Sequence, residues 1–174
     1  MQTMECIRER RSVRDYKPDP IPEEIVKEII EAATHAPSSG NVQDWEFIII
    51  RNLETKTKIA AAAWEQDFIA RAPVVLVVCS DLDRISAAYG TRGETLYSIQ
   101  NTSAAIQNLL LAAWEKEVGS CWVGAFNEST LRDILVLPTN IRPLAIITLG
   151  YPAEVSKKPK RRDIKEVLHM ERWG

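Results

Sequence analysis

Apolar residues along the chain follow two spacings, which separate the expected helices from the expected strands. Over residues 22–36 they recur every three or four positions, as on a helix with one wide apolar face. This helix begins well, with Pro22 and two carboxylates, and it ends before Pro37, because a residue that precedes proline is pushed out of the helical region. Over 99–116 apolar and small residues cover several faces, which predicts a helix packed deep in the molecule.

Strand-like segments lie between these helices. Residues 45–50 are rich in aromatic and β-branched side chains, and 74–79 form a continuous apolar run, typical of a central strand buried on both faces. Other expected elements are helices over 3–10 and 54–70 and strands over 121–123 and 144–149. Residues 81–93 have no clear pattern. The order lacks regular βαβ units, so the predicted class is α+β, with one sheet wrapped by helices in a single domain, 1–174.

Composition is that of an ordinary globular protein, with 174 residues, 45% hydrophobic and 26% charged. A net charge of −2 gives no reason to expect nucleic acid or an anionic membrane as partner. No segment reaches the roughly 20 apolar residues that span a bilayer, and residues 1–17 do not resemble a signal peptide, so we expect a cytoplasmic protein. The cysteines lack metal-ligand spacing, and Cys79 and Cys121 are expected to be buried thiols.

Positive charge gathers near the two ends of the chain. The clustered residues are Arg8, Arg10, Arg11, Arg14 and Lys17 at the start and Lys157, Lys158, Lys160, Arg161 and Arg162 at the end. One guanidinium group can bind two phosphate oxygens at once, and Ser12 adds a neutral donor. The clusters could therefore meet around one compact anion, or each could be a solvated basic surface.

Two further stretches could contact a planar ligand. Residues 36–45 carry hydroxyls, amides and a glycine, which suit either a heterocycle or an ordinary turn. Two glycines bracket residues 120–123, which permits close approach of a flat ligand, unless Trp122 is simply a core aromatic residue. His35 and His169 have no recognisable partner, and no phosphate-binding glycine loop occurs. If the chain is an enzyme, its chemistry would therefore come from an organic cofactor.

Together these stretches resemble the nitroreductase family of flavoproteins. The family signature R-R-S-x-R-x-Y/F is matched by residues 10–16. The signature A-P-S-x-x-N-x-Q-P-W-x-F is matched by residues 36–47, with Asp44 in place of proline, which predicts a less rigid entry to the following strand. Further matches, in the family's order, are residues 66–69, 105–113, 121–124, 150–152 and 160–162.

The resemblance implies a mostly antiparallel central sheet and a homodimer of two interlocked subunits, with FMN sites at their interface. It places Arg10, Arg11, Ser12 and Arg161 at the FMN phosphate and ribityl chain. It places Arg14 at the N1 edge of the ring, where a cation stabilises the charge left by reduction. The residues expected to line the ring are Pro37, Ser38, Ser39, Asn41 and Gln43 of the other subunit, together with Gln66, Trp122, Val123 and Gly124.

The implied activity is an FMN-dependent oxidoreductase. NADH or NADPH would donate hydride, and a nitroaromatic, quinone, free flavin or activated alkene would then accept it at the same site. A flavin-binding sensor or carrier without turnover is an alternative. A domain whose basic ends bind RNA is another, which the negative net charge and the lack of an aromatic-interleaved basic surface disfavour. Residues 88–93 are predicted to form a mobile lid.

Overall fold

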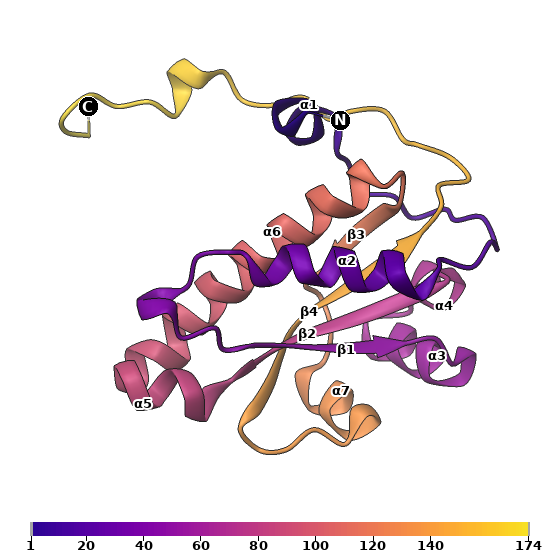
Figure 1. Cartoon of the computed structure of the whole chain (residues 1–174), viewed down its shortest axis with the longest axis horizontal. Helices are drawn as coiled ribbons and strands as arrows, with labels where there is room; N and C mark the ends of the chain where they lie inside the picture. The colour runs from indigo at the N-terminus through magenta and orange to yellow at the C-terminus, as the bar shows by residue number, and fades with distance from the viewer. Residues whose placement is uncertain (1, 174) are drawn as a thin grey trace.

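The computed structural model describes residues 2–173, which fold as a four-stranded antiparallel sheet between two layers of helices (Figure 1). The strand order is β1-β2-β4-β3, with β1 (Trp45–Ile50), β2 (Val74–Asp81), β3 (Gly119–Val123) and β4 (Ile141–Gly150). The helices are α1 (Thr3–Glu9), α2 (Glu23–Thr34), α3 (Leu53–Ala62), α4 (Phe68–Arg71), α5 (Leu82–Arg92), α6 (Ser98–Glu115) and α7 (Glu128–Leu135). Short helical turns are η1 (Ser39–Asn41), η2 (Gly93–Tyr97) and η3 (Ile164–Glu166). The α+β class is confirmed.

The continuous apolar run of β2 is buried on both faces of the sheet, as predicted. Successive side chains of a strand point to opposite faces. Leu76 accordingly packs in a cluster with α2 and α6, whereas Val77 packs in a second cluster with α3, α4 and α7. One short strand therefore joins both halves of the core.

One expected helix is wrong. Residues 54–70 do not form a single helix, because the chain turns between α3 and α4. Trp64 and Glu65 both adopt left-handed backbone angles, with φ of 59° and 58°. Such angles interrupt a right-handed helix and are uncommon in residues with a side chain, so the apolar spacing alone did not indicate the break.

The structure adds α5 and α7, neither of which was predicted. Asp81 begins α5, since its Oδ1 accepts hydrogen bonds from the backbone N–H groups of Asp83 (3.1 Å) and Arg84 (3.3 Å). Gly90 breaks the helix, with φ of 55° and ψ of −146°. Residues 88–93 thus lie in an ordered helical segment, and their movement as a lid stays a prediction.

Beyond β4 the chain leaves the body as an extended tail. Residues 153–173 are almost wholly exposed and pass close to α1 (Figure 1). The tail begins with a hydrogen bond from Ala153 N to Asp15 O (3.0 Å). No helix within residues 2–173 combines the length and the apolar character needed to cross a membrane.

Burial raises the pKa of the Cys79 thiol to about 12, from an ordinary value of 9.0, and Glu46 adds to the effect. Below pH 9 the thiol is protonated in both the folded and the unfolded chain. Between about pH 9 and 12 only the unfolded chain loses the proton, so the free energy of unfolding should fall by about 1.4 kcal/mol per pH unit from this group. Urea unfolding across this range should show a shallower decline for Cys79→Ala than for the wild type. Equal slopes of the unfolding free energy against pH in the two proteins would contradict a raised pKa of Cys79.

Candidate functional site

The basic segment that follows α1 is held along the edge of the sheet. The N–H of Arg10 bonds to Cys6 O (2.8 Å) and ends the helix. Val13 is buried and its N–H donates to Ser120 O of β3 (2.9 Å). This anchor leaves Ser12 and Arg14 nearer the surface on either side of Val13.

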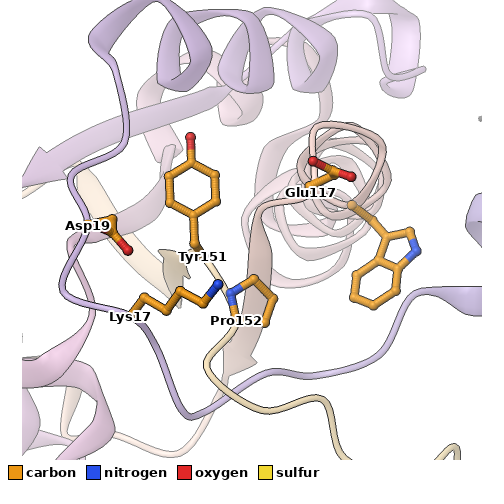
Figure 2. A pocket seen from close by; sticks show the side chains of 6 residues that line it. Lys17, Asp19, Glu117, Tyr151 and Pro152 are labelled. Carbon is orange, nitrogen blue, oxygen red and sulfur yellow. The ribbon is translucent and has the colours of Figure 1, made fainter.

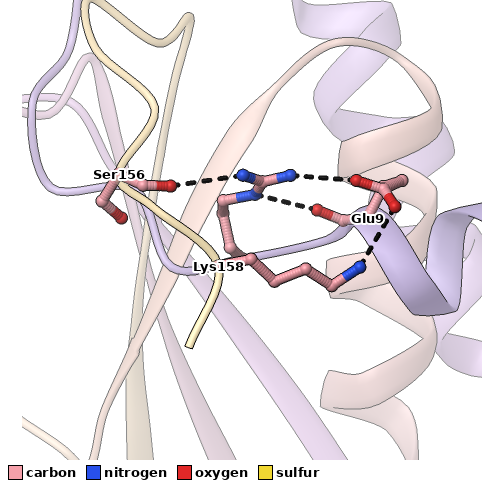
Figure 3. A network of polar contacts seen from close by, with 4 residues as sticks. Glu9, Ser156 and Lys158 are labelled. Atoms are coloured by element: carbon pink, nitrogen blue, oxygen red, sulfur yellow. Dashed lines mark hydrogen bonds and ion pairs between the residues drawn. The ribbon is translucent and has the colours of Figure 1, made fainter. Parts of the chain in front are cut away.

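Arg11 ties the C-terminal tail to this segment, and Figure 3 shows Glu9, Ser156 and Lys158 in the same network of contacts. Its guanidinium donates to Ser156 O (3.2 Å), Glu9 O (3.1 Å) and Glu9 Oε2 (3.0 Å), and it also lies 5.7 Å from the centre of the Trp114 ring. Lys158 completes the network by an ion pair with Glu9 Oε1 (3.1 Å). Arg11 therefore fixes the tail beside the basic segment.

The two basic clusters meet in a pocket of about 370 Å³, here named the basic pocket. It is lined by Arg10, Arg11, Ser12, Arg14, Ser156, Lys157, Pro159 and Arg161. Burial, and then the positive charge of Arg161, lower the pKa of Arg10. Neither guanidinium has a hydrogen-bond or ion-pair partner within residues 2–173. Like charges brought together beside a hydroxyl group make a site for an anion such as phosphate.

Sequence reasoning found only part of this lining. Lys157 belongs to the C-terminal basic cluster, but its place in the pocket was not predicted. Ser156 and Pro159 have no chemical signal of their own in the sequence, because they line the pocket only through the course of the tail.

Three of the predicted ring contacts lie where β3 ends. Val123 is buried, and the Cβ position of Gly124 opens on free space. Trp122 is 38% exposed, so the alternative that it is a core aromatic residue is wrong. Alternation along β3 turns Cys121 and Val123 into the core and Trp122 away from it.

Gln66 joins this region from the turn between α3 and α4. Its Nε2 donates to Ala63 O (2.8 Å) and to Ala125 O (3.3 Å), just beyond β3. The next aromatic residue, Phe68, lies under Arg14, with the guanidinium carbon 5.8 Å from the ring centre. Arg14 and Gln66 thus both contact the segment of residues 63–68, which lies between the basic pocket and the end of β3.

The loop of residues 37–43 lies at the opposite end of α6 from the basic pocket. Ser39 is bound to Asn101 in the first part of α6, whereas Arg11 contacts Trp114 in the last turn. At 1.5 Å per residue these two points of the helix are about 20 Å apart. The chain therefore separates Pro37, Ser38, Ser39, Asn41 and Gln43 from the residues of the basic pocket.

Asp44, which was expected to make the entry to β1 less rigid, is anchored there by hydrogen bonds, and the lower rigidity stays a prediction. Asp44 is fully buried, and its carboxyl group accepts hydrogen bonds from Ser80 Oγ (2.5 Å) and Asn101 Nδ2 (2.6 Å). Its carbonyl also accepts from Asp81 N (2.7 Å). These bonds hold the backbone in the absence of the proline ring.

A larger pocket of about 540 Å³ lies beside the C-terminal end of α6 (Figure 2). It is lined by Lys17, Asp19, Trp114, Glu117, Tyr151 and Pro152. None of the predicted site residues belongs to it, and its charges are mixed. Its Trp114 contacts Arg11 of the basic pocket. The positive charge gathered in the smaller basic pocket therefore favours it as the functional site.

Comparison with known proteins gives consistent matches across the chain. The model of the nitroreductase family matches residues 7–67 and 61–151. The NADH dehydrogenase of Thermus thermophilus is 33% identical over 186 residues, covering 91% of each chain. The NAD(P)H-dependent FMN reductase of Bacillus subtilis is 30% identical over 185 residues, covering 99% of this chain and 74% of the relative. The structure of the NADPH:FMN oxidoreductase of Vibrio harveyi with NAD+ superposes with a TM-score of 0.91 and 26% identity, covering 99% of this chain and 78% of the other.

Proposed function

The chain belongs to the nitroreductase family, and from that premise we propose that it is an FMN-dependent oxidoreductase that uses NADH or NADPH to reduce a small electrophilic acceptor. The acceptor classes that we propose are nitroaromatics, quinones, free flavins and activated alkenes. The names of the relatives from Thermus thermophilus, Bacillus subtilis and Vibrio harveyi, which include NADH, NAD(P)H, NADPH and FMN, support this reaction class.

The observation that carries the proposal is the basic pocket. Arg10 and Arg161 come from opposite ends of the chain, and both face the pocket without an anionic partner within residues 2–173. With the hydroxyl of Ser12 they would hold the FMN phosphate by charge-assisted hydrogen bonds. Arg11 would act mainly through the tail, because Glu9 and Ser156 already occupy its guanidinium. The residues present therefore fit the phosphate end of the cofactor.

The redox chemistry supplied by bound FMN is hydride acceptance from a reduced nicotinamide and its delivery to the acceptor. Arg14 has no ion pair within residues 2–173, so its positive charge is available to stabilise negative charge on the ring. Gln66 and the open backbone at Gly124 would border the ring from the same subunit.

We further propose that the site is completed by a second copy of the chain, which supplies Ser38, Ser39 and Asn41. The distance along α6 between this loop and the basic pocket supports a shared site. Apolar residues also stand exposed on α1 and on the tail, where a partner would cover them: Met4, Ile7, Leu168, Met170 and Trp173. A sedimentation experiment that found a monomer binding FMN tightly would contradict the shared site.

The deciding experiment is an absorbance spectrum of the purified protein, before and after anaerobic addition of NADH or NADPH. We expect flavin bands that bleach rapidly with at least one donor, and parallel double-reciprocal plots when an acceptor is then varied. Full FMN occupancy with slow reduction by both donors would favour the sensor or carrier alternative. A protein that takes up no FMN on soaking would overturn the proposal.

A further inference from the structure

A buried carboxyl group lies directly behind the loop of residues 38–43. Asp44 is fully buried, and each of its carboxyl oxygens accepts one short hydrogen bond, Oδ2 from Ser80 Oγ (2.5 Å) and Oδ1 from Asn101 Nδ2 (2.6 Å). Ser80 is also fully buried, and Asn101 is 3% exposed. Aspartate is seldom buried this completely, and its burial is costly unless its oxygens are satisfied. So complete a burial indicates that Asp44 does more than begin a strand.

Asp44 fixes the orientation of the Asn101 amide. Because the amide nitrogen donates to Asp44, the amide oxygen faces the other way and accepts from Ser39 N (2.9 Å) and Ser39 Oγ (3.1 Å). A flipped amide would present its oxygen to an acceptor and its NH2 group to the Ser39 N–H. Asp44 thus holds both ends of the loop, one as the residue after Gln43 and the other through Asn101.

The loop needs such support because its backbone is unusual. Gly40, Asn41 and Gln43 all have left-handed φ, of 55°, 57° and 55°. Residues with side chains adopt these angles rarely, and such angles persist where the surroundings impose them. Two contacts from α5 assist, since Arg84 Nε donates to Val42 O (2.6 Å) and the Tyr89 hydroxyl packs against Gly40.

We propose that Asp44 is a positioning residue for FMN, which acts through Asn101 to hold Ser39, Asn41 and Gln43 in the conformation that receives the ring bound by the partner subunit. This inference rests on the proposed function. A loop already in its binding conformation loses less freedom when the ligand binds, so a loosened loop binds it more weakly. Asp44 itself does not contact the ligand in this scheme.

An exchange of two side chains tests the proposal. Asn101→Asp places a second carboxyl group opposite Asp44, and two carboxylates have no donor between them, so the bond between the two side chains is lost. Adding Asp44→Asn restores every bond, because the amide nitrogen at 44 donates to the carboxyl group at 101, whose second oxygen accepts from Ser39, and the amide oxygen at 44 accepts from Ser80. Gln107→Glu, at an exposed position on α6, adds the same formal charge and serves as the matched control.

Two measurements read the result, the dissociation constant for FMN by fluorescence titration and hydrogen exchange of residues 38–43 in the apoprotein. For Asn101→Asp we expect about tenfold weaker FMN binding and faster exchange in the loop. The Asp44→Asn/Asn101→Asp protein should recover both, and Gln107→Glu should change neither. A purely structural role would lower the unfolding temperature without changing the affinity of the folded protein.

Unchanged FMN affinity in folded Asn101→Asp, or no recovery in the double variant, would overturn the proposal. If Asn101→Asp does not fold, Asn101→Ala removes the link to Ser39 while leaving the Ser80 bond, and the same two readouts decide. Failure of the wild type to bind FMN would instead overturn the proposed function. Hydrogen exchange would then still distinguish a loop held by Asp44 from one that is not.

Discussion

Replacing Arg10 with glutamate is expected to weaken FMN binding by at least about 100-fold while leaving the apoprotein folded. A hydrogen bond to a charged group contributes about 1.5–3 kcal/mol, and the new carboxylate would also repel the phosphate. The apoprotein should tolerate the change because burial and Arg161 already disfavour the charge of Arg10, which lowers its pKa. A glutamate at this position faces Arg161 as an opposite charge, so the unfolding temperature should be equal or higher.

The measurement is a fluorescence titration with FMN, paired with thermal unfolding with and without the ligand. Wild-type protein should gain stability as FMN rises above its dissociation constant, and the variant should lose that gain. Arg8→Glu is the matched control, because Arg8 lies in the last turn of α1, two residues before Arg10, and its replacement changes net charge equally, but it does not line the basic pocket. Wild-type affinity in Arg10→Glu would show that the phosphate lies elsewhere.

The part of this site that could be predicted from the sequence is the part with a chemical signature. Arginines at both ends of the chain predicted an anion site, and the structure joins them in one pocket. One of the contacts that bring them together uses the carbonyl of Ser156, a group that every residue carries. The burial of Asp44 was missed for a different reason, since an aspartate at the end of a polar loop predicts an exposed turn, and its burial depends on Ser80 and Asn101, distant in sequence.

The fold shows the same division. Continuous or periodic apolar positions predicted β2, α2 and α6, because those elements bury whole faces. The break between α3 and α4 was missed because Trp64 and Glu65 carry no sign of left-handed geometry, which tertiary contacts impose. α7 had a usable signal in Asn127, whose side chain accepts from Thr130 N (2.9 Å) at the start of the helix.

Leu76→Ala is expected to lower the free energy of unfolding by about 3 kcal/mol, within the range of roughly 2–5 kcal/mol for such truncations. Leu76 is fully buried in the middle of β2, between Ile49 of β1 and Ile147 of β4, and it faces the cluster formed with α2 and α6. Neighbouring strands and helices leave little room for collapse into the vacated volume. For a chain of this length, the unfolding temperature should fall by about 6–12 °C.

Urea unfolding at fixed protein concentration and without FMN measures this effect, because bound ligand and association both add apparent stability. Ile49→Ala is the matched control, since Ile49 pairs with Leu76 across the strands but is 43% exposed, so its truncation should cost much less. Equal losses in the two variants would contradict a core centred on β2. Leu76→Ala should also retain wild-type FMN affinity while folded, the reverse of Arg10→Glu. That opposite pair of results would separate the residues that stabilise the fold from those that bind the cofactor.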